Sequence, residues 1–151
     1  DALPISPMSQ GTRCRQLAEY VVFESPLNML CDSPTNYDRE EECTEFIATI
    51  PTVWEQTIAM NGEIGKYITM ARRKGDVWYV GSLTNWDART LTLDLSFLGA
   101  GRWKAEMFHD GVNANRLASD YQKTVTDIPA SRKLTVKMAQ GGGCALKIYK
   151  E

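Results

Sequence analysis

Apolar residues near the start of the chain recur at intervals of three and four, which places their side chains on one face of a helix. Between Thr12 and Leu30 these positions are Cys14, Leu17, Ala18, Val21, Val22 and Leu30. Thr12 suits an N-cap, and Pro26 removes a backbone donor within the pattern. The spacing therefore predicts a helix over residues 12–30 that either bends at Pro26 or restarts at Leu27.

A second helical pattern follows and stops at Pro51. Its apolar positions, at i, i+3, i+4 and i+7, are Cys43, Phe46, Ile47 and Ile50. Asp38 can cap this segment, and the acidic residues 40–42 suit the positive end of a helix dipole. We expect a helix over residues 38–50.

Beyond Pro51 the period changes from 3.6 to two, and turn residues recur every eight to twelve positions. Alternating runs predict strands over residues 67–72, 77–83, 90–95 and 103–107. Hairpin connections are expected at 61–62 and 74–76. A last hairpin should join residues 134–138 to 146–148 through the three glycines 141–143.

These patterns predict a mainly β protein: an antiparallel β-sandwich over residues 51–151, preceded by a helical segment over residues 1–50. The predicted sandwich core consists of Leu91, Leu93, Leu95, Trp103, Met107, Leu134, Val136 and Ile148.

Composition fits a folded chain of about one domain. The 151 residues are 43% hydrophobic and 24% charged, with a formal net charge of -2. The longest basic run, residues 72–74, is too short to track a phosphate backbone, so we expect no nucleic-acid partner. No run approaches the ~20 apolar residues that span a bilayer, so no membrane span is expected. Because the first residue is Asp1 and not Met, we expect a piece of a longer chain.

The four cysteines, Cys14, Cys31, Cys43 and Cys144, form no metal-binding pattern. If Cys14 and Cys31 share one helix, they lie roughly 25 Å apart at 1.5 Å per residue, which is too far for a disulfide. We expect four free thiols.

Catalytic chemistry is sparse in the sequence. The single histidine, His109, lacks a nucleophile motif around it and is interpreted as a solvated loop residue. Asp110, Asn113, Asn115 and Asp120 could offer oxygen ligands, but they lack the spacing of a calcium loop. We predict no catalytic and no metal-binding residue.

Tryptophans are the candidates for ligand contact, because aromatic rings stack on the apolar faces of sugars. Trp103 shares a face with core residues, and only one of Trp78 and Tyr79 can point inward. Trp86 and Trp54 remain as candidate substrate-binding residues, with Trp86 expected to be the more exposed.

Several segments resemble glycoside hydrolase family 97. Residues 11–13, 16–27, 32–34 and Tyr37 are similar to the last helical segment of that family's catalytic barrel. Residues 50–57 (IPTVWEQT) resemble its Pro-Thr-x-Trp-Asp-Glu-Thr segment, with Glu55 and Gln56 in place of Asp and Glu. The segments that look like its C-terminal β-domain are 62–68, 71–75, 78–81, 84–89 and 141–143.

The resemblance implies that residues 1–50 end a (β/α)8 barrel and that the parent is an exported, periplasmic α-glucosidase or α-galactosidase that depends on calcium. The catalytic and calcium-binding glutamates of the family lie upstream of the matched region, so none is assigned here. Glu24 and Glu55 are interpreted as structural, and this chain holds no cofactor of its own.

Three functions are compatible with these observations. The first is a non-catalytic structural module that stabilises the preceding barrel and forms a homodimer through the apolar N-terminal helices. The second is a carbohydrate-binding module that uses Trp86 and Trp54. The third is an autonomous hydrolase, which the missing carboxylates argue against.

Overall fold

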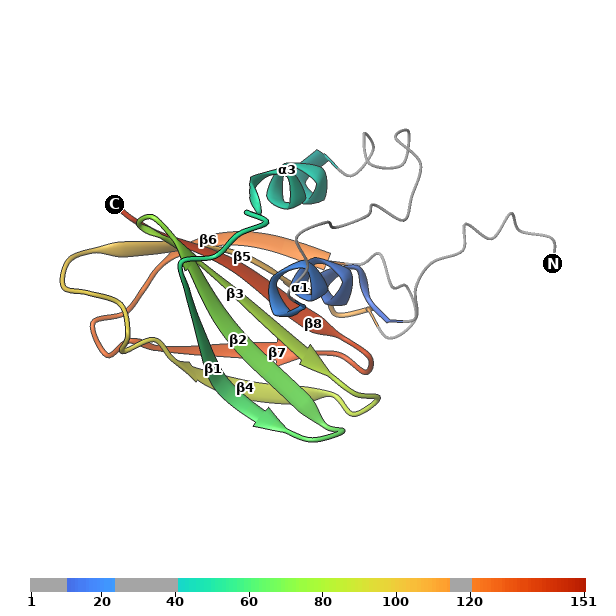
Figure 1. Cartoon of the computed structure of the whole chain (residues 1–151). Coiled ribbons are helices and arrows are strands. Elements are labelled where there is room, and N and C mark those ends of the chain that lie inside the picture. Colours follow the sequence, from blue (N-terminus) through green and yellow to red (C-terminus); the bar gives the residue numbers. More distant parts are fainter. Residues whose placement is uncertain (1–10, 24–40, 115–120) are drawn as a thin grey trace, which may run out of the picture.

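The computed structural model describes residues 11–23, 41–114 and 121–151 (Figure 1). Two helices are present in these ranges, α1 (Arg13–Val22) and α3 (Glu41–Thr49). The strands are β1 (Gln56–Glu63), β2 (Tyr67–Lys74), β3 (Val77–Thr84), β4 (Arg89–Asp94), β5 (Trp103–Asp110), β6 (Tyr121–Asp127), β7 (Lys133–Met138) and β8 (Gly143–Lys150).

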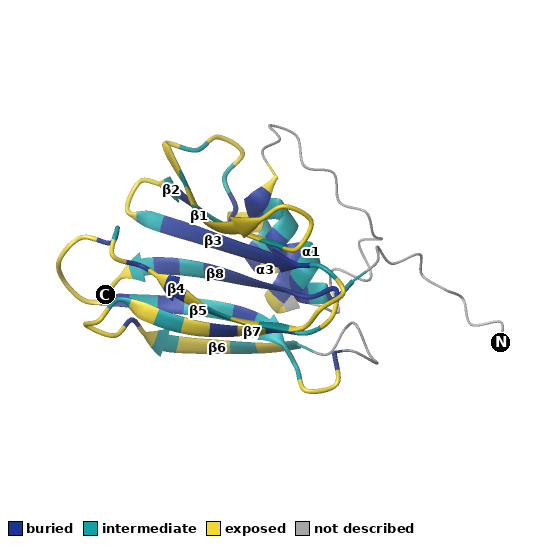
Figure 2. Ribbon diagram, turned by 90° about the horizontal axis from the view of Figure 1, so that it is seen from below, coloured by how far each residue is buried: buried dark blue, intermediate teal, exposed yellow. Residues whose placement is uncertain are grey.

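The strands form two antiparallel sheets. The large sheet has the order β1-β2-β3-β8-β5-β6, and the small one pairs β4 with β7. The helices lie on one face of the large sheet and the small sheet covers the other, as Figures 1 and 2 show from two directions. The mainly β sandwich expected from the sequence is confirmed.

The sandwich core lies between the two sheets. All eight predicted core residues belong to it: five are buried, whereas Leu91, Met107 and Leu134 are partly buried against them. A second apolar cluster lies on the opposite face of the large sheet, beneath the helices. Figure 2 shows burial concentrated on the central strands β3 and β8, so the large sheet is covered on both faces.

Helix α1 begins where the sequence predicts and ends earlier. The backbone N–H of Arg15 donates to the Thr12 hydroxyl at 3.1 Å, which confirms the N-cap. Phe23 has extended backbone angles, so α1 ends at Val22 and a single helix that only bends at Pro26 is wrong. The predicted restart at Leu27 lies outside the described residues. Arg72 donates to the carbonyl of Val22 at 2.7 Å and satisfies the helix end at that point. Pro26 lies outside the described residues, as does Asp38 ahead of α3.

The final hairpin is also predicted wrongly. β7 pairs with β4 in the small sheet, whereas β8 lies between β3 and β5 in the large one. Residues 143–146 of β8 are buried without interruption, so both faces of this strand need cover. The sandwich core covers Cys144 and Leu146 on one face, and the cluster beneath the helices covers Ala145 on the other.

The first predicted hairpin is displaced. Asn61 and Gly62 lie inside β1, next to a bulge where the register shifts between Ala59 and Asn61. The turn falls at residues 64–66, where Gly65 adopts a φ of 77°. The bulge moves the turn beyond the Asn-Gly pair. The second hairpin, through Gly75, is confirmed.

Candidate functional site: the helix-covered face of the large sheet

Small residues on β3 and β8 allow α1 to lie directly on the sheet. A Cβ atom at Gly81 would stand 2.7 Å from the carbonyl oxygen of Ala18 and 2.9 Å from the Cβ of Val21. A Cβ at Gly143 would stand 2.7 Å from the Cα of Arg15. The helix backbone therefore approaches the strands as closely as glycine permits.

Polar contacts fix both ends of α1. At the N-terminal end the backbone N–H of Thr12 donates to the carbonyl of Gly141 at 3.2 Å, and Arg15 donates to the carbonyl of Thr84 at 2.6 Å. At the other end Arg72, only 3% exposed, donates to Val22. Its positive charge also suits the negative end of the helix dipole.

Arg72 and Arg73 belong to the basic run at residues 72–74, and in the structure both make contacts within the chain. Arg72 is buried beneath α1, and its guanidinium carbon lies 6.0 Å from the centre of the Trp54 ring. Arg73 donates to the carbonyl of Gly75 and lies 3.8 Å from a carboxylate oxygen of Glu55. Glu55 in turn accepts from the N–H of Gly75 at 2.6 Å, so its contacts fit a structural role.

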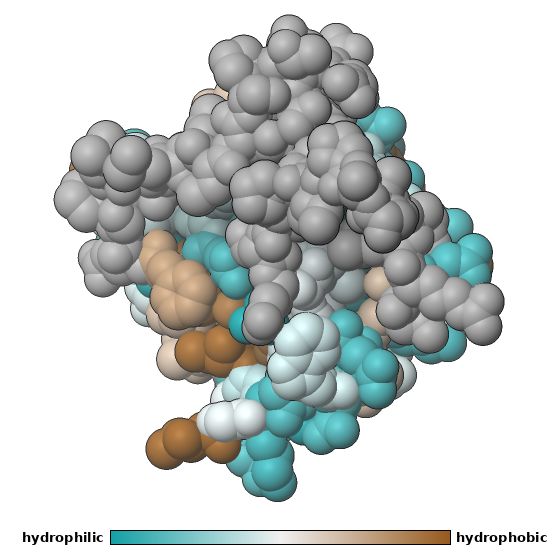
Figure 3. Space-filling model, turned by 90° about the vertical axis from the view of Figure 1, so that its right-hand side faces the viewer, coloured by the Kyte–Doolittle hydropathy of each residue, from teal (hydrophilic) through white to brown (hydrophobic). Residues whose placement is uncertain are grey.

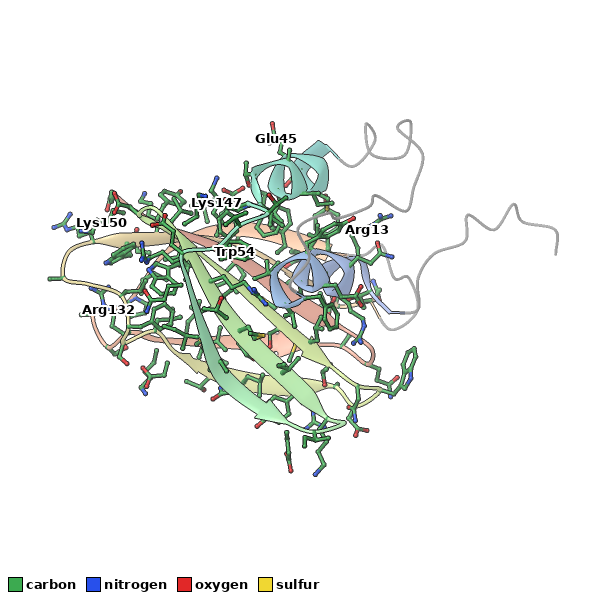
Figure 4. The ribbon with its side chains drawn as sticks, viewed as in Figure 1. Arg13, Glu45, Trp54, Arg132, Lys147 and Lys150 are labelled. Atoms are coloured by element: carbon green, nitrogen blue, oxygen red, sulfur yellow. The ribbon has the colours of Figure 1, made fainter. Side chains whose placement is uncertain are left out.

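Aromatic side chains attach α3 to the same face. The Phe46 ring lies 5.1 Å from that of Phe108 and 6.1 Å from that of Tyr79. Tyr79 donates its hydroxyl to the carbonyl of Thr49 at 2.8 Å, and burial raises the pKa of this phenol. Trp54 packs edge-on against Tyr79 at 5.4 Å. Figure 4 shows Trp54 beside the start of β1, close to α3.

Asp110 connects β5 to the crossover between β7 and β8. Its Oδ2 accepts from the N–H of Ala139 at 2.8 Å and of Gly143 at 3.3 Å. Its Oδ1 is buried and has no hydrogen-bond partner among the described residues. Desolvation raises the pKa of Asp110, while hydrogen bonds from Thr12 and the two backbone amides act in the opposite direction. Through these two amides the carboxylate joins β5 to the connection between β7 and β8.

The structure does not place Asp110 in a calcium loop, because its carboxylate faces these amides. Asn115 and Asp120 lie outside the described residues. Among the residues that are described, no group of three or more His, Cys, Asp or Glu side chains could hold a metal ion. His109 is not in a loop: it lies within β5, half-buried, opposite Gln122 on one side and Cys144 on the other.

Cys14, Cys43 and Cys144 are buried, and none of the three forms a disulfide in the described part of the chain. Burial raises the pKa of the Cys14 and Cys144 thiols far above the usual range, so both are protonated and unreactive at neutral pH. Cys31 lies outside the described residues. Because α1 ends at Val22, the argument that one helix separates Cys14 from Cys31 is wrong, and the free state of Cys31 stays a prediction.

The two candidate tryptophans are far apart. Trp86 follows β3 and is 60% exposed, whereas Trp54 is half-buried near the beginning of that strand. From Tyr79, which Trp54 contacts, to Thr84 at the end of β3 the strand rises about 16 Å at ~3.3 Å per residue. They therefore form no common site. Trp78 and Trp103 are buried in the sandwich core.

Trp86 borders a hollow at the N-terminal end of α1. Its ring lies over Gly141, where a Cβ atom would meet the ring at 2.7 Å. Arg15 and Glu19, which form an ion pair at 3.3 Å, also line the hollow. The hollow has a volume of about 520 Å³. One ring face is thus supported by backbone, and polar groups lie nearby.

Sequence reasoning missed the roles of Gly81 and Arg72. Gly81 lies inside a predicted strand, where an isolated glycine indicates a bulge or a close backbone approach, so this position carried a readable signal. Arg72 carried none, because its role depends on where α1 ends.

The sequence and the fold match one family. The model described as "Glycosyl-hydrolase 97 C-terminal, oligomerisation" matches residues 53–149. A retaining alpha-galactosidase from Bacteroides thetaiotaomicron is 61% identical over 142 residues, covering 94% of this chain and 22% of that protein. The chain belongs to glycoside hydrolase family 97, as the C-terminal oligomerisation domain of a larger enzyme.

Solved structures agree with this assignment. A family 97 enzyme from Pseudoalteromonas sp. strain K8, in complex with acarbose, matches with a TM-score of 0.88 and 39% identity over 93% of this chain. A beta-arabinopyranosidase matches over the same share with a TM-score of 0.79 and 26% identity. The chain covers 23% and 22% of these two structures.

Two further observations concern the source of the relatives and the described helices. The relatives found by sequence are bacterial glycosidases, the second being a probable retaining alpha-galactosidase of Streptomyces bingchenggensis, 29% identical over 96 residues. None of the described helices is long and apolar enough to cross a membrane.

Proposed function

We propose that this chain is a non-catalytic module that stabilises the catalytic barrel preceding it and brings copies of the enzyme together. The observation that carries the proposal is the fixed position of α1 on Gly81 and Gly143. Helix α1, which precedes α3 and the sandwich in the chain, is thereby held on the large sheet, so the helical segment and the sandwich act as one body. The predicted division at residue 51 stays a proposal.

The parent enzyme that we propose is an α-glycosidase of the retaining α-galactosidase type. The 61% identity to a protein of that name supports this choice, although the shared part is only 22% of that protein. By family resemblance we also propose export to the periplasm and a calcium ion. The same resemblance assigns the calcium to the part of the enzyme that precedes the matched region.

Two measurements on the 151-residue chain test this proposal. With nitrophenyl α-galactoside and α-glucoside, the chain should give no turnover above a buffer blank. In sedimentation equilibrium it should form a species larger than 17.0 kDa at micromolar concentration. Turnover would contradict the non-catalytic role, and a monomer at all concentrations would contradict the role in association.

A second candidate function, carbohydrate binding, is favoured by the exposed ring of Trp86. One face of this ring is supported by Gly141 and an ion pair lies across the hollow, an arrangement that suits stacking on a sugar with polar contacts at its edge. Titration of α-galactosides and maltooligosaccharides, followed by tryptophan fluorescence, tests this candidate. Binding should be lost in Trp86→Ala and retained in Trp54→Phe. The absence of millimolar binding by the wild type would exclude the candidate.

A further inference from the structure

Exposed apolar residues gather at the C-terminal end of α1, next to the turn between β1 and β2. Phe23 is 59% exposed, Ile64 is fully exposed at the tip of the turn, and Ile68 is 38% exposed. With Leu83 beneath them, they line a groove of about 510 Å³. Figure 3 shows apolar side chains exposed on the described part of this face. Such a cluster is typical of an interaction surface.

The apolar residues of α1 itself do not supply that surface. Its buried positions all face the sheet of the same chain, and they are Cys14, Leu17, Ala18, Val21 and Val22. Pairing through this face of the helix, as the sequence suggested, would require α1 to leave the sheet. Leu27 and Leu30 lie outside the described residues. The groove, which is formed with α1 in place, needs no such rearrangement.

We infer that this groove is the surface through which two copies of the chain associate. The inference rests on the proposed function and specifies the surface through which the copies would associate. Ile64 projects from the wall of the groove, so a two-fold axis would place each Ile64 in the groove of the other copy. Glu63 and Lys66 flank Ile64 and lie 3.1 Å apart, so one rim carries both charges. The same axis would set Glu63 against Lys66 of the second copy, which makes the surface self-complementary.

The groove runs along α1, from Arg15 in its first turn to Phe23 just after its last residue. The family description names oligomerisation, which supports a second copy of the chain as the occupant. The paired charges of Glu63 and Lys66 on the rim point to the same occupant, because each can face its opposite in an identical copy.

Ile64→Asp in the 151-residue chain tests the inference by sedimentation equilibrium. A charge at this position should raise the dissociation constant of the dimer at least tenfold, because it would be buried in the apolar groove of the second copy. Val112→Asp is the matched control: Val112 is 89% exposed and does not line the groove, so this variant should associate like the wild type. Circular dichroism verifies that both variants fold.

Charge exchange supplies a second readout. Glu63→Lys and Lys66→Glu should each weaken self-association, because each brings like charges together across the axis. An equimolar mixture of the two variants should form heterodimers with higher affinity than either variant alone. The inference would be overturned if Ile64→Asp dimerised as tightly as the wild type. It would also be overturned if the mixture associated no more tightly than either variant alone. In both cases the proposed role in association would still stand. A monomeric wild type would instead remove both the inference and the proposed role in association.

Discussion

Single leucines of the small sheet join the two layers of the sandwich. Leu93 is fully buried, and its strand neighbours Thr92 and Asp94 face solvent. This alternation is legible in the sequence, because a strand with one wet face must repeat every second residue. Tyr79 was harder to place: its neighbour Trp78 points into the sandwich, yet both are buried because α3 and Trp54 cover the opposite face.

Leu93→Ala should lower the free energy of unfolding by about 2 to 5 kcal/mol, because it removes buried methyl groups and leaves a cavity. Urea denaturation measures this loss. Thr92→Ala is the control, since an exposed position in the same strand should change stability by less than about 0.5 kcal/mol. Equal small effects in both variants would place Leu93 outside the core.

Asp110 makes stability depend on pH. Because its pKa is raised in the folded chain, the folded state binds the proton more tightly than the unfolded state. The contribution of this group is therefore fully present below about pH 4, the usual Asp value, and is lost as pH rises through the raised pKa. Asp110→Asn removes this titration at the cost of a buried amide.

Unfolding free energies of wild type and Asp110→Asn, measured from pH 3 to pH 7, test this sign. Any constant cost of the substitution cancels when only the pH dependence is compared. The stability of Asp110→Asn relative to wild type should rise with pH through the window above about pH 4. A relative stability that falls across this window would show that the hydrogen bonds from the amides outweigh desolvation.

At the scale of elements, the position of α1 on the large sheet depends on the close approach of the helix backbone to the glycines of β3 and β8. Gly81→Ala would place a Cβ 2.7 Å from the carbonyl oxygen of Ala18, which belongs to the helix backbone and can move only with the helix. We expect a loss of about 1 to 3 kcal/mol, as overpacking produces. Gly99→Ala is the matched control, because a Cβ there meets nothing within 4 Å.

Thermal and urea unfolding compare the two glycine variants. A destabilisation confined to Gly81→Ala would support close seating of α1, and a similar response in both would contradict it. The near-ultraviolet circular dichroism of the aromatic side chains should also change in Gly81→Ala, because Tyr79 lies two residues away beneath the helical layer.

Helices and strands were predicted well where a local sequence pattern determines them. Strand pairing was predicted poorly where it depends on a partner distant in the sequence. The caps and the alternation identified α1, β4 and β5. The position of β8 could not be read locally, because the β7–β8 turn is compatible with a hairpin and with a crossover. Asp110, from a distant strand, holds this turn through Ala139 and Gly143. Trp86 was correctly predicted to be exposed, but nothing local reveals that Gly141 supports its ring.

At the scale of the whole molecule, the sandwich depends on its helical layer. The large sheet buries Tyr79, Leu83, Phe108 and Ala145 on the face that α1 and α3 cover. Without the helices, this apolar face would meet water on strands that lie at the centre of the sheet. The helices and the sandwich should therefore unfold together, although the sequence divides them at residue 51.

Residues 51–151 alone should unfold at a lower urea concentration than the full chain and should bind a dye specific for exposed apolar surface. The control is a chain of residues 11–151, which retains α1 and α3 and should match the full chain in both measurements. The expected loss of stability follows from the apolar area that the truncation exposes, because each large side chain returned to water costs about 1.5–3 kcal/mol. A truncated chain with the same unfolding midpoint and no dye binding would mean that residues 51–151 are an independent domain and that the helices belong energetically to the barrel.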